Sequence, residues 1–288
     1  RLIMRNFIAV ILFLIPSLLN ATHLIGGELT YTCIGGNQYE IKVVVYRDCG
    51  PTNTNGTGFD GDGVVTIYNM NNNFYDDFEH GSAFSEYVVD EFTSECMTIP
   101  PELCVEKGTY TIVTTLPDNE NGYQIVYQRC CRNEQVINIE DPENFGSSLV
   151  AYVPSSSNAE CNSSPDFDTY PPLAMCLDTE IEISQSASDI DGDSLAFSLV
   201  NPMDGPGTPI SFVTGSGYSL ANPILSSTGL QFDPVTGQIC WNATGPQVCV
   251  VSMKVEEWRE INGVWTLVGT SVREMQIIIL ACNITQPT

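Results

Sequence analysis

The feature that most restricts the fold of this sequence is a repeated alternation of short strand-like segments with turn-forming clusters. Alternating or β-branched apolar runs are separated by Gly, Asn, Asp and Pro along the chain. Beyond the first 21 residues, no window keeps a helical period over three turns. The strand-like segments are residues 27–32, 39–46, 64–68, 110–116, 123–128, 136–139, 149–153, 180–184, 195–200, 230–232, 238–241, 248–258, 265–270 and 272–280. We therefore expect an all-β protein made of two β-sandwich domains in series.

The first residues have the composition of a secretory signal peptide. Arg1 and Arg5 lie before and at the start of an apolar run over residues 7–19, and Ala21 is a small residue before a suitable cleavage point. The run contains Pro16 and is shorter than the roughly 20 apolar residues of a spanning helix. We predict that residues 1–21 are cleaved and that the mature chain is secreted or held at the cell surface, with no membrane span.

The mature chain has the length of two ordinary domains. Residues 156–172 are rich in Ser, Asn and Pro, a composition typical of linkers. We therefore expect an N-terminal sandwich over residues 22–155 and a second sandwich over residues 173–288.

The cysteines indicate disulfides. An exported chain with 11 cysteines is expected to oxidise them, and the odd number leaves one thiol unpaired or bonded to another chain. A turn at Thr244-Gly245 would place Cys240 opposite Cys249 on antiparallel strands, so we predict a bridge between these two. Cys130 and Cys131 are adjacent and poorly placed to bond each other, so each is expected to reach a different strand.

Charge limits the partners of the chain. It carries 35 Asp and Glu residues against 10 Lys and Arg residues, so its surface repels phosphate backbones and anionic membranes. We exclude nucleic acid as a partner and expect cations as ligands. The same acidity also serves solubility.

One acidic stretch has the pattern of a cation-binding loop. In Asp189-Ile190-Asp191-Gly192-Asp193, three carboxylates alternate around a glycine that can adopt φ > 0. The stretch is not an EF-hand, because the twelfth position is Val200 rather than Glu and no amphipathic helices flank it. An alternating strand over residues 195–200 follows instead. We predict Ca²⁺ bound by Asp189, Asp191 and Asp193, with a metal-free Asp/Gly turn as the alternative.

Three side chains have expected structural roles. Arg129 and Arg132 flank Cys130-Cys131 in a chain with few basic residues, so we expect each to contact a carboxylate, with Asp48 as a candidate. The large ring of Trp241 is expected to fill a sandwich core.

Several strings together resemble one protein family. They are Gly26-Gly27-Glu28-Leu29-Thr30-Tyr31-Thr32-Cys33, Tyr46-Arg47-Asp48-Cys49, Tyr127-Gln128-Arg129-Cys130-Cys131-Arg132-Asn133, Asp189 to Leu195, Glu256-Glu257-Trp258-Arg259 and Arg273-Glu274-Met275-Gln276. In this order they resemble the N-terminal region of large secreted Bacteroidetes surface proteins associated with gliding motility and type IX secretion. The Asp-rich loop by itself is also similar to loops of cadherin-like and immunoglobulin-like modules. The resemblance implies an exported, adhesive, β-sandwich protein with a sorting domain beyond these modules, and it implies no particular ligand.

Known catalytic patterns do not emerge from the sequence. Only His23 and His80 could serve a Ser-His-Asp set, and no nucleophile elbow, phosphate-binding Gly-Lys-Ser/Thr loop or zinc helix is present. We therefore expect no enzyme but a calcium-stiffened, disulfide-bonded adhesin that contacts a surface glycan or protein. A self-associating fibre subunit, a carbohydrate-binding module and a glycosidase, which needs only two carboxylates, stay as alternatives.

Overall fold

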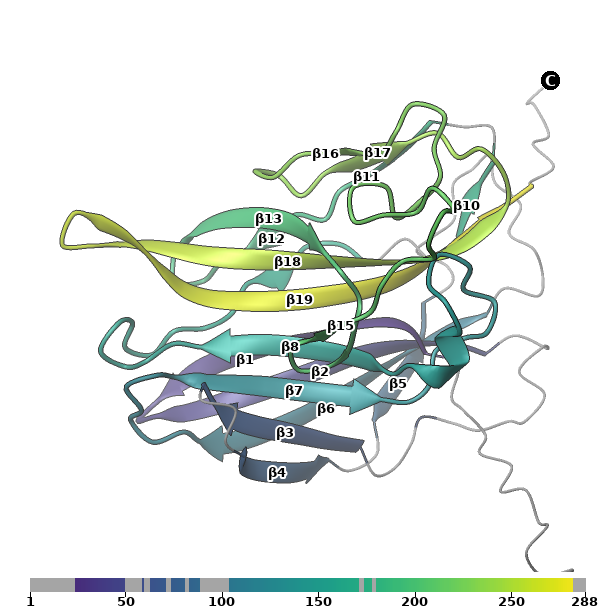
Figure 1. The fold of residues 1–288 in the computed structure, drawn as a ribbon. Helices are drawn as coiled ribbons and strands as arrows, with labels where there is room; N and C mark the ends of the chain where they lie inside the picture. The colour runs from purple at the N-terminus through teal and green to yellow at the C-terminus, as the bar shows by residue number, and fades with distance from the viewer. Residues whose placement is uncertain are drawn as a thin grey trace, which may run out of the picture.

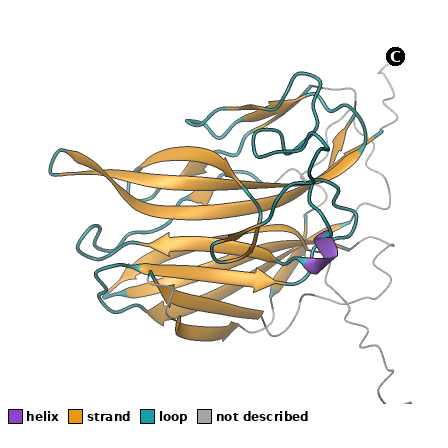
Figure 2. Cartoon of the chain, in the orientation of Figure 1, coloured by secondary structure: helices purple, strands orange, loops and turns teal. Residues whose placement is uncertain are grey.

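A computed structural model describes residues 24–49, 59, 63–70, 74–80, 83–88, 104–170, 174–177 and 180–281. In these residues the protein is all-β, as predicted, and a short 3-10 turn, η2 (Pro142–Asn144), is the helical element (Figure 2). The predicted signal peptide, residues 1–21, lies outside the described residues.

Eight strands of the first half form two layers around one hydrophobic core. One layer has the order β1-β2-β6-β5 and the other has the order β4-β3-β7-β8 (Figure 1). The strands are β1 (Leu24–Gly35), β2 (Gln38–Asp48), β3 (Gly63–Asn69), β4 (Phe74–His80), β5 (Phe84–Tyr87), β6 (Val105–Thr115), β7 (Tyr123–Arg129) and β8 (Ser147–Val153). Because successive side chains of a strand point to opposite faces, alternate residues such as Leu29, Ile41 and Ile125 face the core and are fully buried.

A long hairpin of β18 (Gln247–Ile261) and β19 (Val264–Leu280) connects the two halves. One edge of β19 pairs with β18 along the hairpin. Its other edge pairs first with β8, then with β1, and finally with the parallel strand β10 (Ala174–Cys176). Both layers of the first half are therefore hydrogen-bonded to one C-terminal strand, and the strands form a single curled sheet with the path β4-β3-β7-β8-β19-β1-β2-β6-β5 (Figure 1).

The second half packs on the other side of this hairpin. β13 (Ser194–Val200) pairs with β18, and a small separate sheet lies above it (Figure 1). The remaining strands are β11 (Ile181–Ile183), β17 (Ile239–Trp241) and β16 (Gln231–Phe232) in that small sheet, the pair β9 (Asp166–Phe167) and β12 (Ala187–Ser188), and the pair β14 (Met203–Gly205) and β15 (Thr208–Pro209). Trp241 is 1% exposed in the core between the small sheet and β18–β19, which confirms its expected role.

The arrangement differs from two independent sandwiches joined by a linker. Each half has its own main core, but β19 of the predicted second domain (173–288) pairs with β8 and β1 of the predicted first domain (22–155). The predicted linker, 156–172, is described as far as residue 170, and it contains the fully buried Asn162. Strand pairing between distant segments, which composition does not reveal, is the physical reason for the difference.

Disulfides are present, as the cysteine content predicts. Cys33 is bonded to Cys161 and Cys49 to Cys104, and Cys176 is also disulfide-bonded. Cys130 is bonded to its neighbour Cys131, contrary to the expectation that each would reach a different strand. The bridge Cys33–Cys161 ties the predicted linker to β1.

The predicted bridge between Cys240 and Cys249 is wrong, because both residues are free thiols. Cys240 lies on β17 between the buried Ile239 and Trp241, so strand alternation directs it away from the core. Cys249 is fully buried on β18, where its neighbour across the sheet is Ile277. The two cysteines therefore belong to strands of different sheets rather than to one hairpin.

Candidate cation site

The loop between β12 and β13 carries the three predicted ligands. Gly192 has φ +82, a conformation open to glycine without strain, and its N–H donates to the Asp189 carbonyl at 3.4 Å. The Asp193 N–H donates to Asp189 Oδ1 at 2.9 Å. The loop is thus a compact turn that directs Asp189 and Asp193 toward β18.

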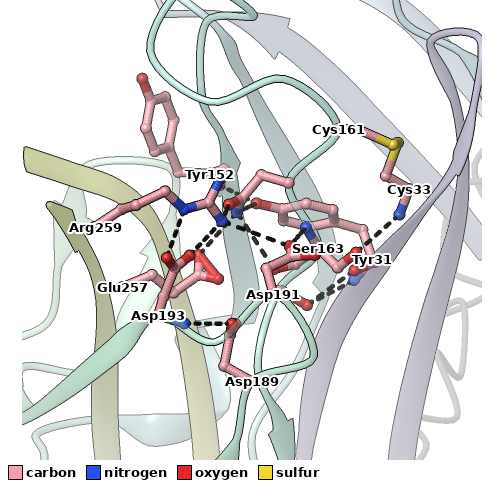
Figure 3. A network of polar contacts seen from close by, with 12 residues as sticks. Tyr31, Cys33, Tyr152, Cys161, Ser163, Asp189, Asp191, Asp193, Glu257 and Arg259 are labelled. Carbon is pink, nitrogen blue, oxygen red and sulfur yellow. Dashed lines mark hydrogen bonds and ion pairs between the residues drawn. A yellow bond between two sulfur atoms is a disulfide. The ribbon is translucent and has the colours of Figure 1, made fainter. Parts of the chain in front are cut away.

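The structure brings two of the predicted ligands together with a third carboxylate that the sequence analysis did not assign. Asp189, Asp193 and Glu257 each offer a carboxylate oxygen, and these oxygens lie within 4.8 Å of one another (Figure 3). Glu257 comes from β18 and is fully buried. We call Asp189, Asp193 and Glu257 the carboxylate cluster.

Glu257 is held in an unusual environment for an acid. It stands opposite Gly269 of β19, and a Cβ at position 269 would lie 1.4 Å from Glu257 Oε2. Oε2 accepts a long hydrogen bond from Asn162 Nδ2 at 3.4 Å, whereas Oε1 has no hydrogen-bond partner among the described residues. Burial, followed by the charges of Asp189 and Asp193, raises the pKa of Glu257 to about 9.

Asp189 has a similar but weaker shift. Its Oδ2 is buried and has no partner among the described residues, and burial raises the pKa of this carboxyl above its usual value. Buried carboxylates without partners are costly, so the cluster as described lacks positive charge.

Arg259 supplies part of that charge. Its Nε and Nη2 donate to the two carboxylate oxygens of Asp193 at 2.6 and 2.7 Å, a bidentate arrangement. Nη2 also donates to Asn162 Oδ1 at 2.7 Å. The Asp193 side chain is only 2% exposed, so this ion pair is shielded from solvent on the aspartate side. One guanidinium faces the three carboxylates of the cluster and Asp191, whose Oδ2 is 3.7 Å from Arg259 Nη2.

Asp191 has a different role from the predicted one. Its Oδ2 accepts a hydrogen bond of 2.6 Å from the Ser163 N–H, so it contacts the chain segment after Cys161 rather than the carboxylate cluster (Figure 3). The hydroxyls of Ser163 and Ser164 accept the N–H groups of Cys33 and Tyr31 on β1. Asp191 thereby connects the acidic loop to the first half of the molecule.

The donor set fits a hard cation. Ca²⁺ takes six to eight oxygen ligands, mainly carboxylates, carbonyls and waters. The cluster offers carboxylate oxygens only, and two of them are buried without a partner. These residues fit Ca²⁺ by chemistry, with Asp189, Asp193 and Glu257 as ligands and with Arg259 competing for Asp193.

Glu257 could have been found from a signal in the sequence. The alternate residues Cys249, Val251, Met253 and Val255 form the buried face of β18, and Glu257 is the next residue in this series. An acid on the apolar face of an alternating strand is a buried carboxylate that needs a counter-charge.

The arginine next to the paired cysteines also contacts a residue that the sequence analysis did not name. Arg132 forms a buried bidentate ion pair with Glu274 of β19, not with the candidate Asp48. Ser147 and Ser252 donate further hydrogen bonds to Glu274. One residue along β19, Arg273 pairs with Glu28 of β1 at 2.9 Å and is fully buried. The strings that carried the family resemblance thus meet along β19, at the junction of the two halves.

Two global observations complete the description. Among the described residues, no helix is long and apolar enough to cross a bilayer. Comparison of the chain with protein-family models, with curated proteins and with solved structures finds no match.

Proposed function

We propose that this chain is an exported, non-catalytic, adhesin-like surface protein that Ca²⁺ and disulfides make rigid. In this proposal residues 1–21 are a cleaved leader, and the two halves act as immunoglobulin-like or cadherin-like sandwiches fused through β19. The resemblance to surface proteins linked to gliding motility and type IX secretion supports a role in surface attachment. The disulfides Cys33–Cys161 and Cys49–Cys104 support maturation in an oxidising compartment.

The observation that carries the calcium part of the proposal is the carboxylate cluster. Glu257 is fully buried with Oε1 unpartnered, and Asp189 Oδ2 is buried without a partner close by. A divalent cation would remove the repulsion among these groups and occupy both orphaned oxygens. An Asp/Gly turn without a metal leaves both of them unexplained.

Calcium would act as a structural link. The acidic loop contacts Ser163 through Asp191, and Arg259 contacts Asn162, so both contacts join the second half to the segment bonded to β1. Extracellular modules bind Ca²⁺ with a Kd of about 10⁻⁴ to 10⁻³ M, so the site would fill outside the cell. At ten times Kd, occupancy adds about 1.4 kcal/mol to the free energy of unfolding.

Thermal unfolding of the mature protein in CaCl₂ and in EDTA tests this proposal. We expect a higher Tm in CaCl₂ for the wild type and a much smaller difference for Asp189→Asn and Glu257→Gln, since each removes one carboxylate ligand. Glu260→Gln is the matched control, because Glu260 lies on β18 but is exposed and outside the cluster. Equal Tm values in CaCl₂ and EDTA for the wild type would remove calcium from the proposal.

Export is tested separately. Mass spectrometry of protein released from or displayed on the producing cell should find a mature N-terminus at residue 22, which lies outside the described residues. A reduced cytoplasmic protein with an intact leader would contradict the surface location.

A further inference from the structure

A pocket lies beside the acidic loop, on the side of β13 that faces away from β18. It has a volume of about 520 Å³, within the roughly 300–1,000 Å³ of small-molecule pockets. Leu195 and Phe197 of β13 form one wall, and the turn between β16 and β17 contributes Val235 and Thr236. Ser184 and Ser186, from the segment between β11 and β12, line the opposite side.

The pocket does not suit an extended peptide. Peptides often bind by adding a strand to a free sheet edge, which requires unpaired N–H and C=O groups along that edge. In the middle of β13 the Phe197 N–H already donates to the Pro234 carbonyl at 2.8 Å. The protein's own turn therefore blocks strand addition at this edge.

Charge excludes two further ligand classes. No Lys, Arg or His lines the pocket, whereas Asp189 and Asp193 do, so an anion such as a phosphate or carboxylate would be repelled. An ammonium group would need an accessible carboxylate, but both Asp193 oxygens bond Arg259 and Asp189 has Oδ1 bonded in its own turn and Oδ2 buried. The pocket thus favours a neutral ligand.

The groups that can contact a neutral ligand are hydroxyls, an amide and an apolar wall. The Ser184 and Thr236 hydroxyl oxygens each accept a backbone N–H, which leaves each hydroxyl hydrogen able to donate. Gln238 donates its Nδ-type amide hydrogen to Glu182 through Nε2, which leaves its carbonyl oxygen as an acceptor. Val235 is 73% exposed and offers apolar surface at the rim. Hydroxyls that bond Ser, Thr and Gln while C–H groups contact an apolar wall are the pattern of a sugar ring.

We propose that this pocket binds a neutral, hydroxyl-rich ligand, a sugar unit of a surface glycan. The inference deepens the proposed function, on which it rests for its surface setting, by naming the ligand class of the adhesin. Asp189 and Asp193 belong both to the pocket and to the carboxylate cluster, so the loop that holds the cation also forms one wall of the sugar site.

A glycan array probed with the mature protein in CaCl₂ tests the inference. We expect binding to a subset of neutral glycans. Val235→Trp should weaken it by at least about tenfold, because the indole fills the pocket mouth. Ser186→Ala, which removes one hydroxyl, should weaken it about threefold to tenfold. Val113→Trp is the matched control and should bind as the wild type does, because Val113 is 55% exposed on β6, outside the pocket.

The inference is overturned by three results: no bound neutral glycan, binding confined to sialylated or sulfated glycans, or equal binding by the wild type and Val235→Trp. Cadaverine binding without glycan binding would also overturn it, in favour of a cationic ligand. The calcium-dependent Tm of Val235→Trp separates this failure from failure of the proposed function. A preserved Tm shift with no glycan binding removes only the sugar site, whereas glycan binding with no Tm shift removes only the calcium.

Discussion

At the scale of single residues, the chemistry of this protein is concentrated in Glu257. Its carboxyl group is fully buried, faces Asp189 and Asp193, and has one oxygen without a partner among the described residues. Arg259 compensates Asp193 directly and Glu257 only at a distance. Glu257 is therefore the group that responds most strongly to pH or to a cation.

The raised pKa of Glu257 predicts the direction of a pH effect without calcium. The folded protein holds this proton up to a pKa of about 9, whereas an unfolded chain releases it near the ordinary value of 4.5. Between these values the folded state binds more protons, so the free energy of unfolding decreases as pH rises, by at most about 1.4 kcal/mol per pH unit from this group. The raised pKa of Asp189 acts in the same direction.

Urea unfolding in EDTA at several pH values between about 5 and 9 measures this slope. The wild type should lose stability with rising pH, and Glu257→Gln should show a shallower slope because Gln does not titrate. Glu260→Gln should behave as the wild type does. A slope that Glu257→Gln leaves unchanged would show that Glu257 is ionised at neutral pH in the folded protein.

At the scale of elements, the β18–β19 hairpin builds the cluster. A β-bulge between Glu257 and Trp258 interrupts the regular pairing with β19, and such bulges redirect side chains near functional sites. Gly269 faces Glu257 across the hairpin and leaves the space that its carboxylate occupies. A glycine in a strand interior usually marks such a close approach.

Gly269→Ala should therefore displace the Glu257 carboxylate. We expect a loss of about 1–3 kcal/mol in the free energy of unfolding, typical of overpacking, and a smaller Tm shift in CaCl₂. Gly245→Ala is the matched control, because no atom lies within 4 Å of a Cβ at that position. If Gly269→Ala keeps both the stability and the calcium shift of the wild type, Glu257 is not fixed by the hairpin.

At the scale of the whole molecule, β19 makes the two halves one folding unit. It pairs with β8 and β1 of the first half, and Arg273 and Glu274 form buried ion pairs with Glu28 and Arg132 of that half. Removing one partner of a buried ion pair costs about 3–5 kcal/mol, since a charge is left uncompensated. The Cys33–Cys161 bridge, with a sequence separation of 128, adds about 5 kcal/mol in the chain-entropy model.

The first half should therefore not fold without β19. Residues 24–172 expressed alone in an oxidising compartment are expected to lack the cooperative unfolding transition of the full chain. Near-UV circular dichroism and urea unfolding measure this difference. A cooperative transition in the fragment would show that a boundary near residues 156–172 separates independent domains.

The sequence alone determined the class of the fold and several local features. Alternating apolar residues and turn clusters predicted the all-β structure, because each strand buries one face, and the size of Trp241 predicted its place in the core. The acidic loop was also recognisable, since Gly192 and the spacing of Asp189 and Asp193 are local properties. These features depend on residues close together in the chain.

Only the tertiary structure decided which distant segments meet. It paired β19 with β1 and β8, left Cys240 and Cys249 as free thiols, gave Arg132 to Glu274, and placed Glu257 in the cluster while Asp191 turned to Ser163. Each outcome follows from strand order and from the face on which a residue lies within the assembled sheets. Local pattern fixes the alternation of a strand, but its neighbours are chosen by the packing of the whole chain.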